Sequence, residues 1–298
     1  LSSARFIVLV AILGLAAATT VYAAAAGIRE VASEATGVPA LFLNLFTLGA
    51  DQVPAFYALV GFLAPLLGIA FGFDAVNGER SEGTLPRLLA QPIHRDDVIN
   101  GKFAAGLTVI GLMLVALALL VAGVGILRLG VVPTGSEIVR IMLWLAVSVV
   151  YVGFWLAFAT LCSVVMRRAA TSALVAIGVW LALTLFGALL VNLVAGTLAP
   201  TPTGGTDSEI LRSEQFRETI ARLSPTTLYQ EATVVLLNPN VRSLGAILPQ
   251  QADRAIASLL PLEQSLLLVW PQVVALVALT VVSFAAAYIV FMRQEVRA

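Results

Sequence analysis

Residues that could take part in chemistry are concentrated in one polar stretch, residues 74–102. It reads DAVNGERSEGTLPRLLAQPIHRDDVINGK and holds the one histidine of the sequence, His94. The one cysteine, Cys162, lies inside an apolar run, and a lone thiol can form neither an internal disulfide nor a paired-cysteine metal site. We therefore expect Cys162 to be a packing residue and His94 to be a solvated side chain.

Enzymatic chemistry and metal transport both lack the residues that they need. A nucleophilic serine or cysteine requires a histidine beside it, and His94 would have to serve every such pair. No HExxH or GxSxG motif is present. Soft metals select Cys, Met and His ligands, but the sequence has one Cys, one His and four scattered Met. The sequence thus predicts a protein with no catalytic residues, metal site or cofactor of its own.

The composition is that of a protein with several membrane spans. Hydrophobic residues make up 60% of the sequence and charged residues 11%, and the mean hydropathy is +0.99. The formal net charge of zero gives no sign of nucleic-acid binding. A helix of about 20 apolar residues crosses the hydrocarbon core of a bilayer. Six windows satisfy this requirement, at approximately 5–28, 56–73, 103–127, 140–166, 171–197 and 266–292. We predict an all-α membrane protein with a single six-helix domain over residues 1–298.

The interiors of these six windows contain no Asp, Glu, Lys or His. Carriers driven by protons or sodium ions normally place a carboxylate or unwound backbone near the middle of the membrane. Neither feature is evident in this sequence, so we expect the energy for transport to come from elsewhere.

The distribution of basic residues predicts the orientation, because short connections rich in Arg and Lys stay in the cytoplasm. One side carries Arg80, Arg87, Arg95, Lys102, Arg167, Arg168, Arg293 and Arg297, and the other carries Arg29, Arg128 and Arg140. We therefore predict that both termini are cytoplasmic. The first window ends in the small-residue run VYAAAAG, so a cleaved signal sequence is the alternative to a retained helix, although the window is longer than a secretory apolar segment.

Two connections on the other side have structure of their own. Residues 29–55 contain LFLNLFTLG, which is too short to span and predicts a helix that lies at the interface or dips back into the bundle. Residues 198–265 begin with the turn-forming run APTPTGGTDS. Apolar residues then recur at helical spacing, at Ile210, Leu211, Phe216, Ile220 and Leu223. We predict a small extracytoplasmic helical cap over residues 198–265.

Local signals within residues 74–102 predict a short helix in the cytoplasm. Gly83 breaks the preceding chain, Thr84 is a suitable N-cap, Pro86 is tolerated in a first turn, and Pro92 ends the segment. The leucines of this helix share one face, so it would present an apolar ridge flanked by charges. The residues of this candidate docking surface are Glu79, Arg80, Glu82, Gly83, Thr84, Leu85, Arg87, Leu88 and Leu89. The ridge could equally pack against the ends of the protein's own helices.

The same stretch closely resembles the signature of ABC-2 type ABC transporter permeases. The resemblance is carried by the run NGERSEGTL at residues 77–85, then Leu88-Leu89, Pro92 and Gly101-Lys102. It is closest to the permease branch associated with multicopper-enzyme maturation, and Ser224-Pro225 is similar to a recurring element of these proteins. The resemblance implies that residues 74–102 form a coupling loop, whose short helix binds in a cleft of a cytoplasmic ABC ATPase.

The family resemblance also implies the partners. Residues 101–103 lack the GxxxxGK[ST] pattern of a phosphate-binding loop, so ATP and magnesium are expected in the separate ATPase subunit, present in two copies. A second permease copy is expected because six spans form half of the membrane part, and a prokaryotic inner membrane is the implied location. Export of a substrate is the first hypothesis. The alternatives are relay of ATP-driven motion to an extracytoplasmic partner at 198–265, and a membrane scaffold or channel that uses no ATP.

Overall fold

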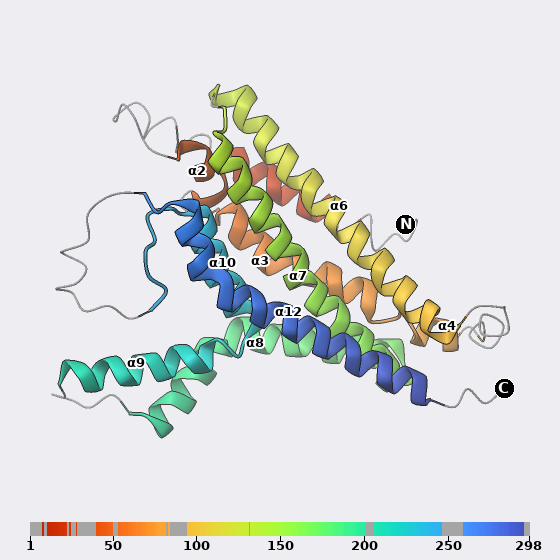
Figure 1. Cartoon of the computed structure of the whole chain (residues 1–298). Helices are drawn as coiled ribbons and strands as arrows, with labels where there is room; N and C mark the ends of the chain where they lie inside the picture. The colour runs from red at the N-terminus through yellow and green to blue at the C-terminus, as the bar shows by residue number, and fades with distance from the viewer. Residues whose placement is uncertain are drawn as a thin grey trace.

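In the computed structural model of the chain, the described residues form an assembly of α-helices (Figure 1). The structure describes residues 8, 11–22, 24, 28, 40–49, 53–81, 83, 94–130, 132–200, 206–245 and 259–294. Its labelled helices are α2 (Leu41–Thr47), α3 (Phe56–Gly72), α4 (Asn77–Ser81), α6 (Arg95–Leu129), α7 (Gly135–Val165), α8 (Ala169–Leu198), α9 (Asp207–Ala221), α10 (Pro225–Leu237) and α12 (Leu262–Arg293). The all-α prediction is confirmed for this part of the chain.

Among the residues that the structure describes, five helical stretches are long and apolar enough to cross a membrane. They are α3 continued through α4 to Ser81, and then α6, α7, α8 and α12. The window at 5–28 is described mainly as the shorter apolar helix Ala11–Tyr22, and the rest of it lies largely outside the described residues. The protein is therefore a multi-pass membrane protein, and within its described residues five of the six predicted windows form helices of spanning length.

Helix α7 lies at the centre of the bundle, and its most extensive contacts are with α12 and α3 (Figure 1). The chain direction defines two ends. We call the end that carries α4 and the start of α6 the loop end, and the end that carries α2 and the start of α7 the far end. Helices α3, α7 and α12 run from the far end to the loop end, whereas α6 and α8 run in the reverse direction.

Two glycines allow α3 to approach the backbone of α7. A Cβ on Gly68 would lie 2.6 Å from the Val152 carbonyl oxygen, and one on Gly72 would lie 2.7 Å from the Leu156 carbonyl oxygen. Glycines four positions apart are a known device for close helix packing in membranes. The sequence analysis did not use this GxxxG spacing, although it could be read from residues 68–72.

Substitution of Gly72 by Ala should destabilise the bundle, because the added methyl group would meet backbone atoms of α7 that cannot move freely. Overpacking of this kind costs about 1–3 kcal/mol. Thermal unfolding of the purified protein in detergent should show a lower Tm for Gly72→Ala. The matched control is Gly178→Ala in α8, where a Cβ meets nothing within 4 Å; equal Tm values for the two variants would contradict the packing argument.

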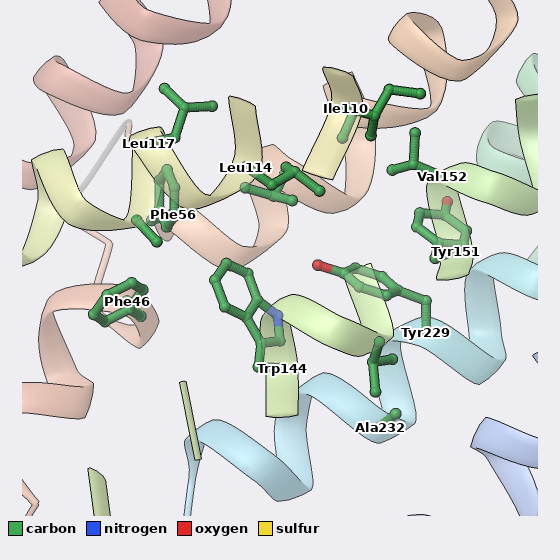
Figure 2. Packing of buried hydrophobic residues seen from close by; sticks show 14 of the residues in the cluster. Phe46, Phe56, Ile110, Leu114, Leu117, Trp144, Tyr151, Val152, Tyr229 and Ala232 are labelled. Carbon is green, nitrogen blue, oxygen red and sulfur yellow. The ribbon is translucent and has the colours of Figure 1, made fainter. Parts of the chain in front are cut away.

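Helix α2 dips back into the bundle, which decides between the two predictions for residues 29–55. Its Phe42, Leu43, Leu45 and Phe46 are buried. Figure 2 shows Phe46 beside Phe56 of α3 and Trp144 of α7. The three rings meet edge to face at centroid distances of 5.8–5.9 Å, a favourable arrangement for aromatic pairs.

Within residues 198–265, which were predicted to form a helical cap, α10 lies against the helices of the bundle. It packs mainly on α12 and α7, and its Tyr229 stacks on Tyr151 of α7 with ring centroids 4.3 Å apart (Figure 2). The physical reason is that α10 has apolar residues on more than one face. A helix resting on the membrane surface buries one face, so it would leave the other apolar residues of α10 exposed. Helix α9 does form at the predicted place, with Thr206 and Glu209 capping its first turn.

Polar side chains from the first turns of α7 form hydrogen bonds with backbone groups at the ends of α2 and α10. The Glu137 carboxylate accepts a hydrogen bond from Phe42 N of α2, at 3.1 Å. Arg140 is 4% exposed and donates to the carbonyl oxygens of Val235 and Leu236 at the end of α10. A cation at a helix C-terminus is favoured by the helix dipole. Glu137 and Arg140 therefore hold two short helices within the bundle.

Helix α9 and the outer half of α8 lie apart from the other helices at the far end (Figure 1). Arg217 of α9 donates to the side-chain oxygen of Asn192 in α8, at 3.2 Å. Many apolar side chains on the outer half of α8 are exposed, namely Leu185, Phe186, Leu189, Leu190, Leu193 and Leu198. These side chains can contact lipid or another protein chain.

Candidate functional site

The predicted docking residues divide between the described and the undescribed parts of residues 74–102. Glu79 and Arg80 lie in α4, and Gly83 has a φ of +68°, a left-handed conformation that glycine adopts without strain. The remaining predicted residues, Glu82, Thr84, Leu85, Arg87, Leu88 and Leu89, lie outside the described residues. The structure thus describes where this connection leaves the bundle and where it returns.

The connection returns to the bundle earlier than predicted. Helix α6 begins at Arg95, so the last eight residues of the predicted loop are helical and Gly101-Lys102 lies inside the helix rather than at its start. The Asp97 carboxylate accepts from the backbone N–H of His94, which caps the first turn. The hydropathy window missed this turn because its residues are polar and extend beyond the apolar segment. His94 itself is exposed, at the N-cap position.

Lys102 joins α6 to α4. Its ammonium group donates to the Ala75 carbonyl oxygen at 2.7 Å and to the Glu79 carboxylate at 3.0 Å. Both charged side chains are about one-third exposed, so solvent weakens the ion pair. The sequence analysis used Lys102 as a basic residue of the predicted cytoplasmic side and as part of the family signature, and its spacing from Glu79 gave no signal of this contact.

Ser163, near the end of α7, holds the start of α4. Its fully buried hydroxyl oxygen accepts from Val76 N at 3.0 Å and from Asn77 N at 3.1 Å. The first N–H groups of a helix have no partner within the helix, so an outside acceptor stabilises that end. Sequence reasoning missed Ser163, because a serine in an apolar window usually bonds within its own helix.

Asn77, the first residue of α4, is fully buried, yet neither atom of its side-chain amide has a hydrogen-bond partner among the described residues. Its neighbour in the sequence, Val76, belongs to a small apolar cluster that also includes Ile99, Val164 and Phe291. A buried polar group without a partner costs about 1–3 kcal/mol. The position of α4 is therefore less stable than its hydrogen bonds alone suggest.

Gln294, directly after α12, contacts both sides of the connection. Its side-chain oxygen accepts from Arg80 at 2.6 Å, and its backbone oxygen accepts from Arg95 at 3.3 Å. Its side-chain nitrogen donates to the Val164 carbonyl oxygen at 2.8 Å. The sequence analysis did not single out Gln294.

A groove of about 550 Å³ runs along α4 where α3 and α6 meet. Asp74, Glu79 and Lys102 line one part of it, and Phe71, Gly106 and Val109 line another. The described residues around α4 thus present charged and apolar surface together, without a nucleophile–histidine pair. Among the described residues, no three His, Cys, Asp or Glu side chains group closely enough to hold a metal ion.

Replacement of Ser163 by Ala should loosen α4 without unfolding the bundle. The Val76 and Asn77 amides would lose their acceptor, at a cost of about 1–3 kcal/mol, so their hydrogen exchange should accelerate by about one to two powers of ten. Exchange measured by mass spectrometry in detergent tests this. The control is Ser81→Ala, which removes an exposed hydroxyl of α4 that donates to Gly78 O within the same segment. Unchanged exchange in Ser163→Ala would show that Ser163 does not hold α4.

Comparison with known proteins assigns the class that this helical membrane fold and polar connection suggest. Residues 1–296 match the family described as ABC-2 family transporter protein. Since the match covers nearly the whole chain, the chain belongs to this family and is a permease subunit of an ABC transporter, as the signature at residues 77–102 predicted.

One relative is itself described as an ABC transporter permease. The probable ABC transporter permease protein NosY of Stutzerimonas stutzeri is 29% identical over 219 residues, which cover 69% of this chain and 74% of NosY. The family match and the similarity to NosY both indicate an ABC transporter permease.

Proposed function

We propose that the chain is the membrane subunit of an exporter and that a separate cytoplasmic ABC ATPase docks on residues 74–102. The observation that carries this proposal is the attachment of α4, the helix from which the connection leaves the bundle. Lys102 of α6, Ser163 of α7 and Gln294 after α12 all bond to residues 75–80. A force applied to the connection would therefore act on several helices.

The proposed topology has six spans with both termini and the loop end in the cytoplasm of a prokaryotic cell. Arg80, Arg95 and Lys102 lie at the loop end, and Arg167 and Arg168 are exposed in the short connection between α7 and α8 at the same end. This concentration of basic residues supports the orientation. Arg167 and Arg168 are then anchors at the membrane boundary or a second contact with the ATPase.

The proposed assembly contains two permease copies and two ATPase copies. The permease chain supplies six helices, and the family resemblance implies that two such halves surround one translocation path. Support comes from α8, most of whose apolar surface faces away from its own bundle. ATP and magnesium belong to the ATPase subunits in this proposal.

In the proposed mechanism, ATP binding draws the two ATPase subunits together and displaces the coupling helix within residues 84–92. Helices α3 and α6 flank this segment and move with it. The unpartnered Asn77 amide is consistent with movement at this point, because α4 loses less on displacement than a fully satisfied helix would. Helix movement at the interface of the two permeases then opens the path for export.

Replacing Leu88 or Leu89 with Asp should release the ATPase, because a charge on the apolar ridge would be buried without a partner in the docking cleft. The measurement is co-purification of the ATPase with the detergent-solubilised permease. The control is Val132→Asp, since Val132 is 74% exposed in the connection between α6 and α7 at the far end. Equal ATPase recovery with Leu88→Asp and with the control would contradict docking on this ridge.

A second candidate function is mechanical relay to an extracytoplasmic partner bound by residues 198–265. The observation in its favour is that α10 is buried against α7 and α12 while the adjoining α9 lies outside the main bundle. Movement of the bundle would thus be passed directly to an exposed helix.

Relay predicts that α9 can be removed without loss of ATPase assembly. Replacing residues 207–221 with a flexible Gly/Ser segment should abolish cross-linking of the permease to extracytoplasmic proteins in intact membranes, while the ATPase still co-purifies. The replacement spares α10, which the bundle needs for its packing. A permease without α9 that gives the same cross-linked products would refute this second function.

A further inference from the structure

Gln294 is placed to join the last helix to the connection between α3 and α6. It is the C-cap residue of α12, which ends at Arg293. Through its side chain and its backbone oxygen it bonds to Arg80, which precedes the undescribed part of the connection, and to Arg95, which follows it. One residue after α12 thus contacts both sides of the connection.

The chemistry of these contacts favours this position. The carbonyl end of a helix carries partial negative charge, so two guanidinium groups at the end of α12 are stabilised there. Hydrogen bonds from a charged donor are stronger than those between neutral groups. The Gln294 amide also uses its donor, on the Val164 carbonyl oxygen, so both polar atoms of its side chain have a partner.

Helix α12 has further polar contacts that lead towards the far end. Gln272 of α12 donates to the Glu231 carboxylate of α10 at 2.8 Å. Ser265, in the first turn of α12, accepts from Arg140 of α7 at 3.1 Å. Along its length α12 packs against α7 and α10, two of the most extensive helix contacts of the described chain. A displacement of the loop end of α12 would therefore be passed to the segment that contains α10.

We propose that Gln294 is a positioning residue that couples the 74–102 connection to α12 through its hydrogen bond with Arg80. Displacement of the connection by the ATPase then moves α12, and with it α10, in addition to α3 and α6. This inference rests on the proposed docking of an ATPase. The coupling role differs from a purely structural role. If Gln294 were only structural, its loss would weaken the fold or the assembly but would leave the transmitted movement of the assembled complex unchanged.

The test measures distances between spin labels in the full permease–ATPase complex in lipid nanodiscs. The buried Cys162 is first replaced by Ala. One pair of labels joins α12 to α8 through Leu267→Cys and Leu193→Cys, and a second joins α6 to α8 through Leu127→Cys and Leu193→Cys; all three side chains are well exposed. Labelled permease is diluted with unlabelled permease, and distances are recorded without nucleotide and with Mg-ATP and orthovanadate.

In the unsubstituted background both pairs should change on nucleotide trapping. In Gln294→Ala the change of the α12–α8 pair should be lost while that of the α6–α8 pair persists. Gln294→Glu keeps an oxygen for Arg80, so it should retain both changes. Arg293→Ala, the exposed neighbouring residue, is the matched control and should also retain both.

Retention of the α12–α8 change in Gln294→Ala, or its loss in Gln294→Glu, would overturn the coupling role. Failure of Gln294→Ala to fold or to hold the ATPase would assign Gln294 a structural role instead. If the unsubstituted complex shows no nucleotide-dependent change in either pair, or if no ATPase binds, the proposed function is wrong and the inference fails with it.

Discussion

The structure depends on one constraint: short helices that begin or end inside an apolar bundle must find partners for their terminal backbone groups. Water is scarce there, and each unsatisfied group is costly. Helix α7 supplies these partners near both of its ends. Glu137 accepts from the start of α2, Arg140 donates to the end of α10, and Ser163 accepts from the start of α4. The central helix therefore fixes the positions of three short helices by side-chain hydrogen bonds.

This arrangement connects the two ends of the molecule. At the loop end α4 is bonded to α6, α7 and the residue after α12, yet its first residue, Asn77, has a side-chain amide without a partner among the described residues. At the far end α10 is packed tightly within the bundle, with Tyr229 stacked on Tyr151. A firmly packed frame with one less stable helix at the polar connection suits the proposed permease, which would receive its energy from a separate ATPase subunit.

The sequence predicted what depends on local pattern and missed what depends on distant partners. The helical windows and the presence of short helices near α2 and α9 follow from apolar length and periodicity, whereas the sequence left open whether α2 lies at the interface or dips into the bundle. Ser163 and Gln294 could not be predicted, because their partners Val76 and Arg80 lie 87 and 214 positions away along the chain. The burial of α10 was missed because a connection with charged neighbours suggests a surface location, whereas the Gly68–Gly72 spacing was readable.

The most direct test of the central claim is the structure of the permease bound to its ATPase, determined by single-particle electron microscopy. We predict that residues 84–92 form a helix bound in a cleft of the ATPase, with α4 still in contact with Lys102, Ser163 and Gln294 in the nucleotide-free state. An ATPase that contacts only Arg167-Arg168 or the C-terminal tail, with residues 84–92 packed against the permease's own helices, would contradict the claim.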